Sequence, residues 1–179
     1  LGLSGNGLTD FTGLAQIEHM GSSASSLYLT NNGIRDLSTL ADDRVRRIDL
    51  SDNEIHDIGP LQRMSLDSLF LSDNKLSDLS PLAVMPPIPY LLLNNNQISD
   101  LSPFKAHYPI GTEVNRVELN NNIISYVGDA LLGISRGIVD LENNPLLCSE
   151  KRAMEDASGY DFELSRNVYF YVSEECVPD

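Results

Sequence analysis

The chain has 179 residues, a length typical of one domain, and its 12 Lys and Arg stand against 26 Asp and Glu, for a formal net charge of −14. Non-specific nucleic-acid binding depends on Lys and Arg displacing counterions from phosphates, so this charge balance argues against a nucleic-acid partner. No apolar run reaches the roughly eighteen residues that a membrane-spanning helix needs, so we expect no direct membrane insertion of this segment.

One phrase recurs through most of the chain. It reads L-x-L-x-x-N-x-L-x-x-L-x-x-L, with other apolar residues at some Leu positions. The seven copies, here called rungs, begin at Leu1, Leu27, Ile48, Leu69, Leu91, Val117 and Val139. Their asparagines are Asn6, Asn32, Asn53, Asn74, Asn96, Asn122 and Asn144. Most rungs are therefore 21 or 22 residues long, and two carry insertions, near 15–25 and 105–113.

Each rung predicts a short strand followed by a sharp turn. Alternating apolar residues such as Leu69 and Leu71 place their side chains on one face of a strand, and strands of successive rungs then pair in parallel. Where the chain turns inside the protein, backbone donors and acceptors need partners, which an inward-pointing amide supplies. We therefore interpret the recurring Asn as a structural ladder without a chemical role.

An Asp follows the ladder Asn by four residues in the first five rungs. These residues are Asp10, Asp36, Asp57, Asp78 and Asp100. Several stand shortly before a Pro, as in the sequence from Asp57 to Leu61. An Asp ahead of a short helical turn accepts hydrogen bonds from its free N–H groups, and Pro fits early in such a turn. We predict that these five carboxylates cap their rungs.

This repeat resembles that of the leucine-rich repeat family. The combination N-x-[IL]-x-D-[IL]-x-P-[LF] is similar to the short repeats of bacterial internalins and of cytosolic phosphatase regulators. The resemblance implies an α/β solenoid, a curved horseshoe with parallel strands on the concave face and short helical turns or loops on the convex face. We expect a solenoid of about seven rungs over residues 1–147, with no N-terminal cap because the sequence opens inside a repeat, and a C-terminal cap over 148–179.

The C-terminal segment shows a different pattern. We expect a short helix over 150–157 and a strand over 168–172 that covers the last rung, whose edge would otherwise be unpaired. Cys148 and Cys176, the only cysteines, bracket this segment, as in the disulfide-closed caps of extracellular leucine-rich repeat proteins. Such caps commonly hold two bridges and a Trp, whereas this chain has one pair and no Trp. A bond implies an oxidising compartment; two reduced thiols in a cytosolic protein are the alternative.

The search for catalytic motifs is negative. His19, His56 and His107 are the only histidines, none has a metal-ligand spacing, and we expect all three at the surface. The alternation of Asp49, Ser51 and Asn53 is reminiscent of a calcium loop, but the loop's Gly and distal Glu are missing. No phosphate loop or nucleophile motif occurs. We expect no metal, no cofactor and no enzymatic activity.

Function is therefore expected on the outward strand positions, which in this family line the concave face. These carry the apolar residues Tyr28, Phe70, Tyr90 and Leu92 and the charged residues Arg47, Asp49, Arg116, Glu118 and Asp140. Asp52, Asp73 and Glu142 add further acids beside them. Exposed aromatic residues are candidate binding anchors. In the alternative interpretation, the aromatic residues only favour their strands and the acids only keep the surface soluble.

These features together predict a non-catalytic recognition module that binds a protein or peptide on its concave face. The surplus of acids favours a basic partner. We expect the extracellular or cell-surface part of a larger receptor or adhesin. The alternative is an intracellular leucine-rich repeat scaffold or regulatory subunit in the cytoplasm, which the short Asp-Pro repeats resemble about equally well.

Overall fold

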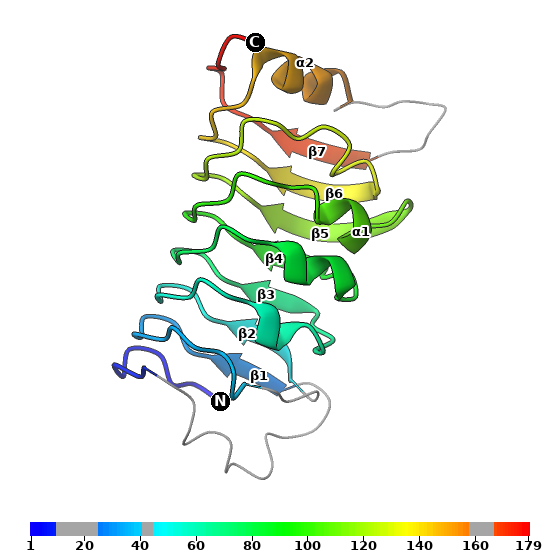
Figure 1. Cartoon of the computed structure of the whole chain (residues 1–179). Coiled ribbons are helices and arrows are strands. Elements are labelled where there is room, and N and C mark those ends of the chain that lie inside the picture. The colour runs from blue at the N-terminus through cyan, green and yellow to red at the C-terminus, as the bar shows by residue number, and fades with distance from the viewer. Residues whose placement is uncertain (10–24, 41–44, 158–166) are drawn as a thin grey trace.

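The computed structural model describes residues 1–9, 25–40, 45–157 and 167–179, so the predicted cap Asp10 and His19 lie outside the described residues. Seven parallel strands form one open sheet in sequence order (Figure 1). They are β1 (Ser25–Tyr28), β2 (Val45–Asp49), β3 (Ser68–Phe70), β4 (Tyr90–Leu92), β5 (Thr112–Glu118), β6 (Ile134–Asp140) and β7 (Asn167–Tyr171). The predicted parallel solenoid is confirmed. The first rung contributes an isolated bridge between Gly2 and Tyr28.

The core consists of two apolar columns that run along the solenoid. The central strand residues Leu27, Ile48, Leu69, Leu91, Val117 and Val139 are register partners across β1 to β6 and are fully buried. The second apolar position, two residues later, is equally buried in the rungs of β1 to β6, as at Leu71 and Leu93, whereas Leu3 in the first rung is partly buried. Because each rung contacts only its neighbours, the repeat period alone produces one continuous core.

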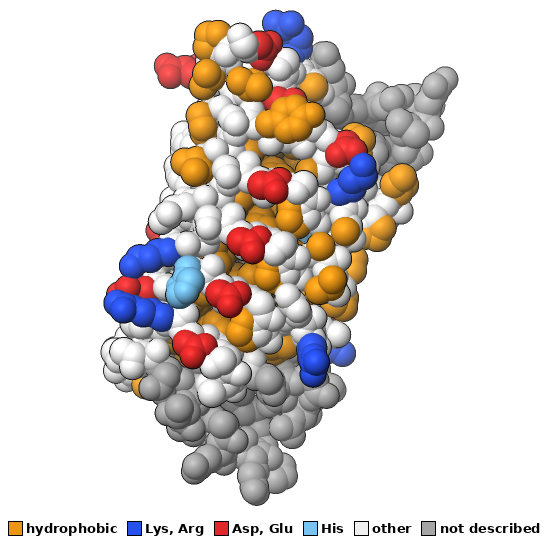
Figure 2. Space-filling view, in the orientation of Figure 1, with side chains coloured by type: hydrophobic (Ala, Val, Ile, Leu, Met, Phe, Trp, Pro, Cys, Tyr) orange, Lys and Arg blue, Asp and Glu red, His pale blue; other side chains and the backbone are white. Residues whose placement is uncertain are grey.

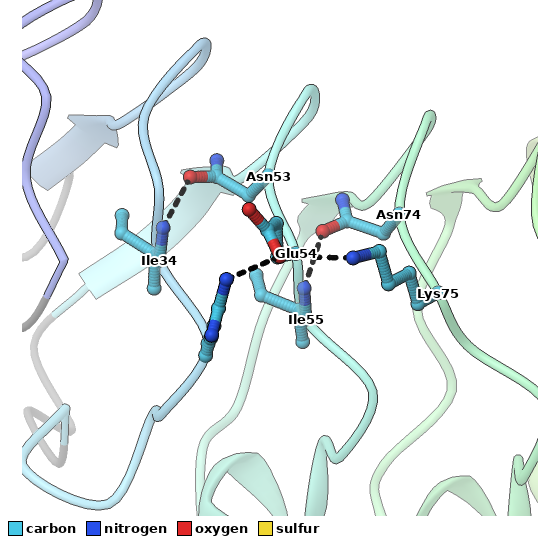
Figure 3. A network of polar contacts seen from close by, with 7 residues as sticks. Ile34, Asn53, Glu54, Ile55, Asn74 and Lys75 are labelled. Atoms are coloured by element: carbon cyan, nitrogen blue, oxygen red, sulfur yellow. Dashed lines mark hydrogen bonds and ion pairs between the residues drawn. The ribbon is translucent and has the colours of Figure 1, made fainter.

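The ladder asparagines connect each rung to the one before it. The side-chain oxygen of Asn53 accepts a hydrogen bond from the backbone N–H of Ile34 at 3.1 Å, and that of Asn74 accepts from Ile55 at 2.9 Å (Figure 3). The Asn74 amide also donates to the carbonyl of Leu50, in the preceding rung, at 3.0 Å. Asn53, Asn74, Asn96, Asn122 and Asn144 are all buried, whereas Asn6, in the first rung, is exposed.

An exposed ion-pair network joins three of the same rungs at the surface. A carboxylate oxygen of Glu54 lies 2.8 Å from Arg35 and 2.8 Å from Lys75 (Figure 3). The hydrogen bond from Lys75 and the charge of Arg35 lower the pKa of Glu54. Glu54 and Lys75 directly follow the ladder residues Asn53 and Asn74, and Arg35 directly follows Ile34, whose N–H donates to Asn53.

Short helical turns lie on the other side of the sheet from the outward strand positions. They are the 3-10 helices η2 (Gly59–Leu61) and η3 (Ser80–Val84) and the helix α1 (Phe104–His107). Asp57 accepts from the N–H of Gly59 at 2.7 Å and Asp78 from that of Ser80 at 2.7 Å, so each carboxylate caps the first residue of its 3-10 helix. The side chains of Asp36 and Asp100 likewise accept from the backbone N–H of the residue two positions later. Figure 2 shows a line of acidic side chains along this face.

The expectation that His107 lies at the surface is wrong. Its ring is fully buried at the end of α1, beside the rings of Phe104 and Tyr108. Nδ1 donates to the carbonyl of Leu82 at 2.9 Å, and Nε2 accepts from the N–H of Ile88 at 3.4 Å. The insertion in this rung supplies two rings to the core, those of His107 and Tyr108, which pack beside the ring of Phe104. His56, by contrast, is exposed.

The C-terminal segment closes the far end of the sheet. Helix α2 (Cys148–Ala157) begins two residues before the predicted start, and β7 pairs with β6 along its whole length. A disulfide joins Cys148 and Cys176, as the resemblance implied. A backbone bridge between Leu147 and Val177 lies beside it. The chain that follows β7 is therefore tied back to the start of α2.

Candidate recognition face

The strand register places all nine predicted site residues on one side of the sheet, here called the strand face. Two columns of outward side chains flank the buried central column. The first column contains Ser26, Arg47, Ser68, Tyr90, Arg116, Ile138 and Tyr169, and the second contains Tyr28, Asp49, Phe70, Leu92, Glu118, Asp140 and Tyr171. Neighbouring residues within a column belong to adjacent strands, whose backbones lie roughly 4.8 Å apart.

The middle of this face is apolar. Phe70 and Leu92 are register partners on β3 and β4 and are half-buried, while Tyr90 is 42% exposed. These three residues are here called the apolar centre. The guanidinium of Arg47 lies 4.7 Å from the centre of the Phe70 ring, which is a cation–π contact. Tyr28 lies two rungs away and is 39% exposed, with Asp49 between it and Phe70.

The charged residues are concentrated on either side of this centre. Arg116 and Glu118, both on β5, form an ion pair. Glu118 is the register partner of Asp140, so two carboxylates occupy neighbouring strands. Asp140 accepts a hydrogen bond from the backbone N–H of Glu142 at 3.0 Å, and Asp49 accepts from that of Ser51 at 3.2 Å. The strand face is therefore apolar in the middle and acidic toward its C-terminal strands.

The backbone conformation explains why two of the acids near the apolar centre are Asp residues. Asp52 and Asp73 have positive φ angles of 55° and 56°. The same turn position in the other described rungs is held by Gly5, Asn31, Asn95, Asn121 and Asn143, all with positive φ. Gly, Asn and Asp tolerate this left-handed backbone better than other residues. The residue types at this position therefore give no evidence for a partner.

Sequence analysis missed two residues of the strand face, Tyr169 and Tyr171. They are the register partners of Ile138 and Asp140, and they are 59% and 48% exposed. Val168 is buried, and the partly buried Phe170 continues the central column beside Val139. The alternation of this segment contained the signal. Because the segment follows a break in the repeat, its alternation alone does not indicate to which face of the sheet these side chains belong.

A metal centre is not evident. Among residues 1–9, 25–40, 45–157 and 167–179, no group of three or more His, Cys, Asp or Glu side chains is arranged to hold a metal ion. Within the same ranges, none of the helices combines the length and the hydropathy that crossing a bilayer requires. The nine predicted site residues present three aromatic rings, one Leu side chain, three carboxylates and two guanidinium groups on the strand face.

Solved structures with the same fold come from Listeria monocytogenes. An internalin (inlF) has 26% sequence identity over 97% of this chain and superposes with a TM-score of 0.74. An internalin C2 (inlC2) has 22% identity over 96% of this chain, with a TM-score of 0.65. The chain spans 47% of the length of the first structure and 79% of the second. No protein-family model and no curated protein sequence matches. The chain thus has the leucine-rich repeat fold of the internalins.

Proposed function

We propose that this chain, with its internalin-like leucine-rich repeat fold, is a non-catalytic recognition module that binds a protein or peptide on its strand face. The observation that carries the proposal is the apolar centre of Phe70, Tyr90 and Leu92. These large side chains face outward on a sheet that buries its two inward columns completely from β1 to β6. Large, rigid apolar groups grouped on one surface are typical anchors of protein interfaces.

The disulfide supports a location outside the cytoplasm. Bonds such as that between Cys148 and Cys176 form and persist in oxidising compartments and are rare where thiols are kept reduced. We propose a secreted or cell-surface setting, as part of a larger protein of the receptor or adhesin type. Mass spectrometry of the purified protein without reductant tests this setting. Two free thiols would instead support the intracellular scaffold.

The test of the binding surface is the double variant Phe70→Ala/Tyr90→Ala. A partner is first captured from extracellular proteins and identified, and its dissociation constant is then measured by calorimetry. Loss of two anchors, each contributing more than about 1 kcal/mol, should weaken binding at least about tenfold. The Tyr90→Ala change should affect thermal unfolding little, because Tyr90 is already 42% exposed, and the half-buried Phe70 should account for most of any loss of stability.

The matched control is Val84→Ala/Ile110→Ala. These apolar residues are 69% and 92% exposed but lie outside the strand-face columns. This variant should bind the partner as the unmodified protein does. Unchanged affinity in the Phe70→Ala/Tyr90→Ala variant would contradict the proposal.

A further inference from the structure

The C-terminal end of the strand face carries a second aromatic surface. Tyr169 and Tyr171 project from β7, a strand that belongs to no repeat, and they are more exposed than the residues of the apolar centre. Strands β5 and β6 separate the two surfaces. The pair therefore forms a distinct contact region, here called the β7 surface, whose surroundings decide what it can bind.

The charge beside Tyr171 is negative, whereas the exposed Arg136 on β6 is the register partner of Asn167, two residues before Tyr169. Asp140 is the register partner of Tyr171 on one side and of Glu118 on the other. Arg116 is engaged with Glu118. In the part of the chain that the structure describes, no ion pair joins Asp140 or Glu142 to a Lys or Arg. Like charges on neighbouring strands are unfavourable, so a cation supplied by a partner would stabilise this surface.

An unsatisfied acceptor lies in the same region. The side-chain oxygen of Asn120, just after β5, is buried and has no hydrogen-bond partner among the described residues. Its neighbour in the next rung is Glu142, whose carbonyl accepts from the N–H of Asn121 at 2.9 Å. Buried polar atoms in folded proteins nearly always have a partner. Because this oxygen is buried, it lies out of reach of a segment bound at the surface.

We propose that the β7 surface, together with Asp140 and Glu142, binds Lys or Arg side chains of a basic segment in the protein partner. The proposal rests on the proposed function, because it specifies the partner of the same face. A Lys or Arg side chain stacks on a Tyr ring through a cation–π contact, and the adjacent carboxylates pair with its charge. An apolar occupant would bury these carboxylates without partners, which is costly. A second copy of this chain would bring another −14 charge against them.

The probe is a fluorescein-labelled peptide of four Lys-Gly repeats, with a peptide of four Glu-Gly repeats as its control. Binding is measured by fluorescence anisotropy at low and high salt. The Lys-Gly peptide should bind with an affinity that falls as salt rises, and the Glu-Gly peptide should not bind. Absence of Lys-Gly binding at low salt would overturn the proposal.

The decisive variant is Asp140→Asn/Glu142→Gln, which should weaken Lys-Gly binding at least about tenfold. Its control, Asp52→Asn/Asp73→Asn, removes the same charge and places the residue found in other rungs at the same left-handed turn. That control should change the affinity less than about twofold. Equal losses in both variants would show attraction to net charge alone and would overturn the proposal.

A second pair of variants tests the rings and separates the two proposals. Tyr169→Leu/Tyr171→Leu should weaken Lys-Gly binding at least about fivefold, whereas Phe70→Ala/Tyr90→Ala should leave it within about twofold. Unchanged binding in the Tyr variant would overturn the role of the β7 surface. If the Phe70→Ala/Tyr90→Ala variant bound the captured partner with unchanged affinity, the proposed function would be contradicted. The Lys-Gly result would still stand.

Discussion

At the residue scale, single buried side chains hold neighbouring rungs together. Asn74 is 8% exposed, accepts from Ile55 and donates to carbonyls of two successive rungs, Leu50 and Leu71. These backbone groups lie inside the turn, where water does not replace a lost partner. The amide is therefore part of the scaffold in the same sense as the apolar columns.

Replacing Asn74 with Ala should leave buried backbone groups unpaired and lower the free energy of unfolding by about 1–3 kcal/mol. Urea denaturation followed by circular dichroism measures this loss. The matched control is Asn6→Ala, since Asn6 begins the ladder and is exposed, and it should lower stability by much less. Similar losses in the two variants would contradict the ladder interpretation.

His107 gives the fold a dependence on pH. Burial lowers its pKa from the ordinary value of 6.5, and both ring nitrogens already have backbone partners. Because Nε2 accepts a hydrogen bond, protonation there would break a contact with Ile88. The unfolded chain thus binds a proton more readily than the folded one. The stabilising contribution of neutral His107 is present above pH 6.5 and is lost as the pH falls below that value.

The variant His107→Gln should flatten the fall in stability between about pH 7 and pH 5, although it should be less stable at neutral pH. Thermal unfolding at a series of pH values checks this. His56→Gln is the control, because His56 is exposed, and it should keep the slope of the unmodified protein. A His107→Gln variant with an unchanged slope would rule out this residue as the cause.

At the scale of elements, the sixth rung departs from the pattern and the helix α2 compensates. Tyr126 occupies the position at which earlier rungs carry the capping Asp. The missing carboxylate is supplied by Glu150, which accepts from the N–H groups of Val127 at 3.1 Å and Gly128 at 2.9 Å. This residue lies in the first turn of α2, so the same contact docks the helix on the last rungs.

Replacing Glu150 with Ala should therefore free two backbone donors and loosen α2. We expect a loss of about 1–3 kcal/mol in the free energy of unfolding, since hydrogen bonds to charged groups are stronger than neutral ones. Chemical denaturation measures the loss, and hydrogen exchange in α2 locates it. Glu174→Ala is the control, because only the backbone carbonyl of Glu174 accepts a bond from Lys151. Equal stability of the two variants would contradict the compensating role.

At the scale of the whole molecule, the disulfide joins the C-terminal segment to the solenoid. The two cysteines are 28 positions apart in the sequence, and the loop that they close contains all of α2 and all of β7, so the bond restricts the unfolded chain. The chain-entropy relation gives about 3–4 kcal/mol for a loop of this size. The bond also keeps β7 against β6, where its tyrosines complete the strand face.

The variant Cys148→Ser/Cys176→Ser should lower the midpoint of thermal unfolding and raise hydrogen exchange first in β7 and α2. Reduction of the unmodified protein with dithiothreitol should reproduce both effects. Strands β2 to β4 serve as the internal control, because they lie far from the bond in the sheet order. If hydrogen exchange rose equally in all strands, the whole solenoid, and not only its C-terminal segment, would depend on the disulfide for its stability.

The sequence by itself determined the repeating part of this protein. The two-residue alternation around Leu69 decides which side chains are buried and which face outward, and the near-constant rung length repeats that choice along the sheet. All nine predicted strand-face residues could therefore be placed from the repeat alone, since their positions depend only on local register.

Only the tertiary structure decided the features that join distant parts of the chain. The repeat period stops before β7, so the alternation of this segment indicates which side chains share a face, and only the pairing of β7 with β6 shows that Tyr169 and Tyr171 extend the strand face. Glu150 replaces the missing cap of the sixth rung, and His107 is buried by the packing of an irregular insertion. Each outcome depends on contacts between segments of different pattern, which local periodicity does not encode.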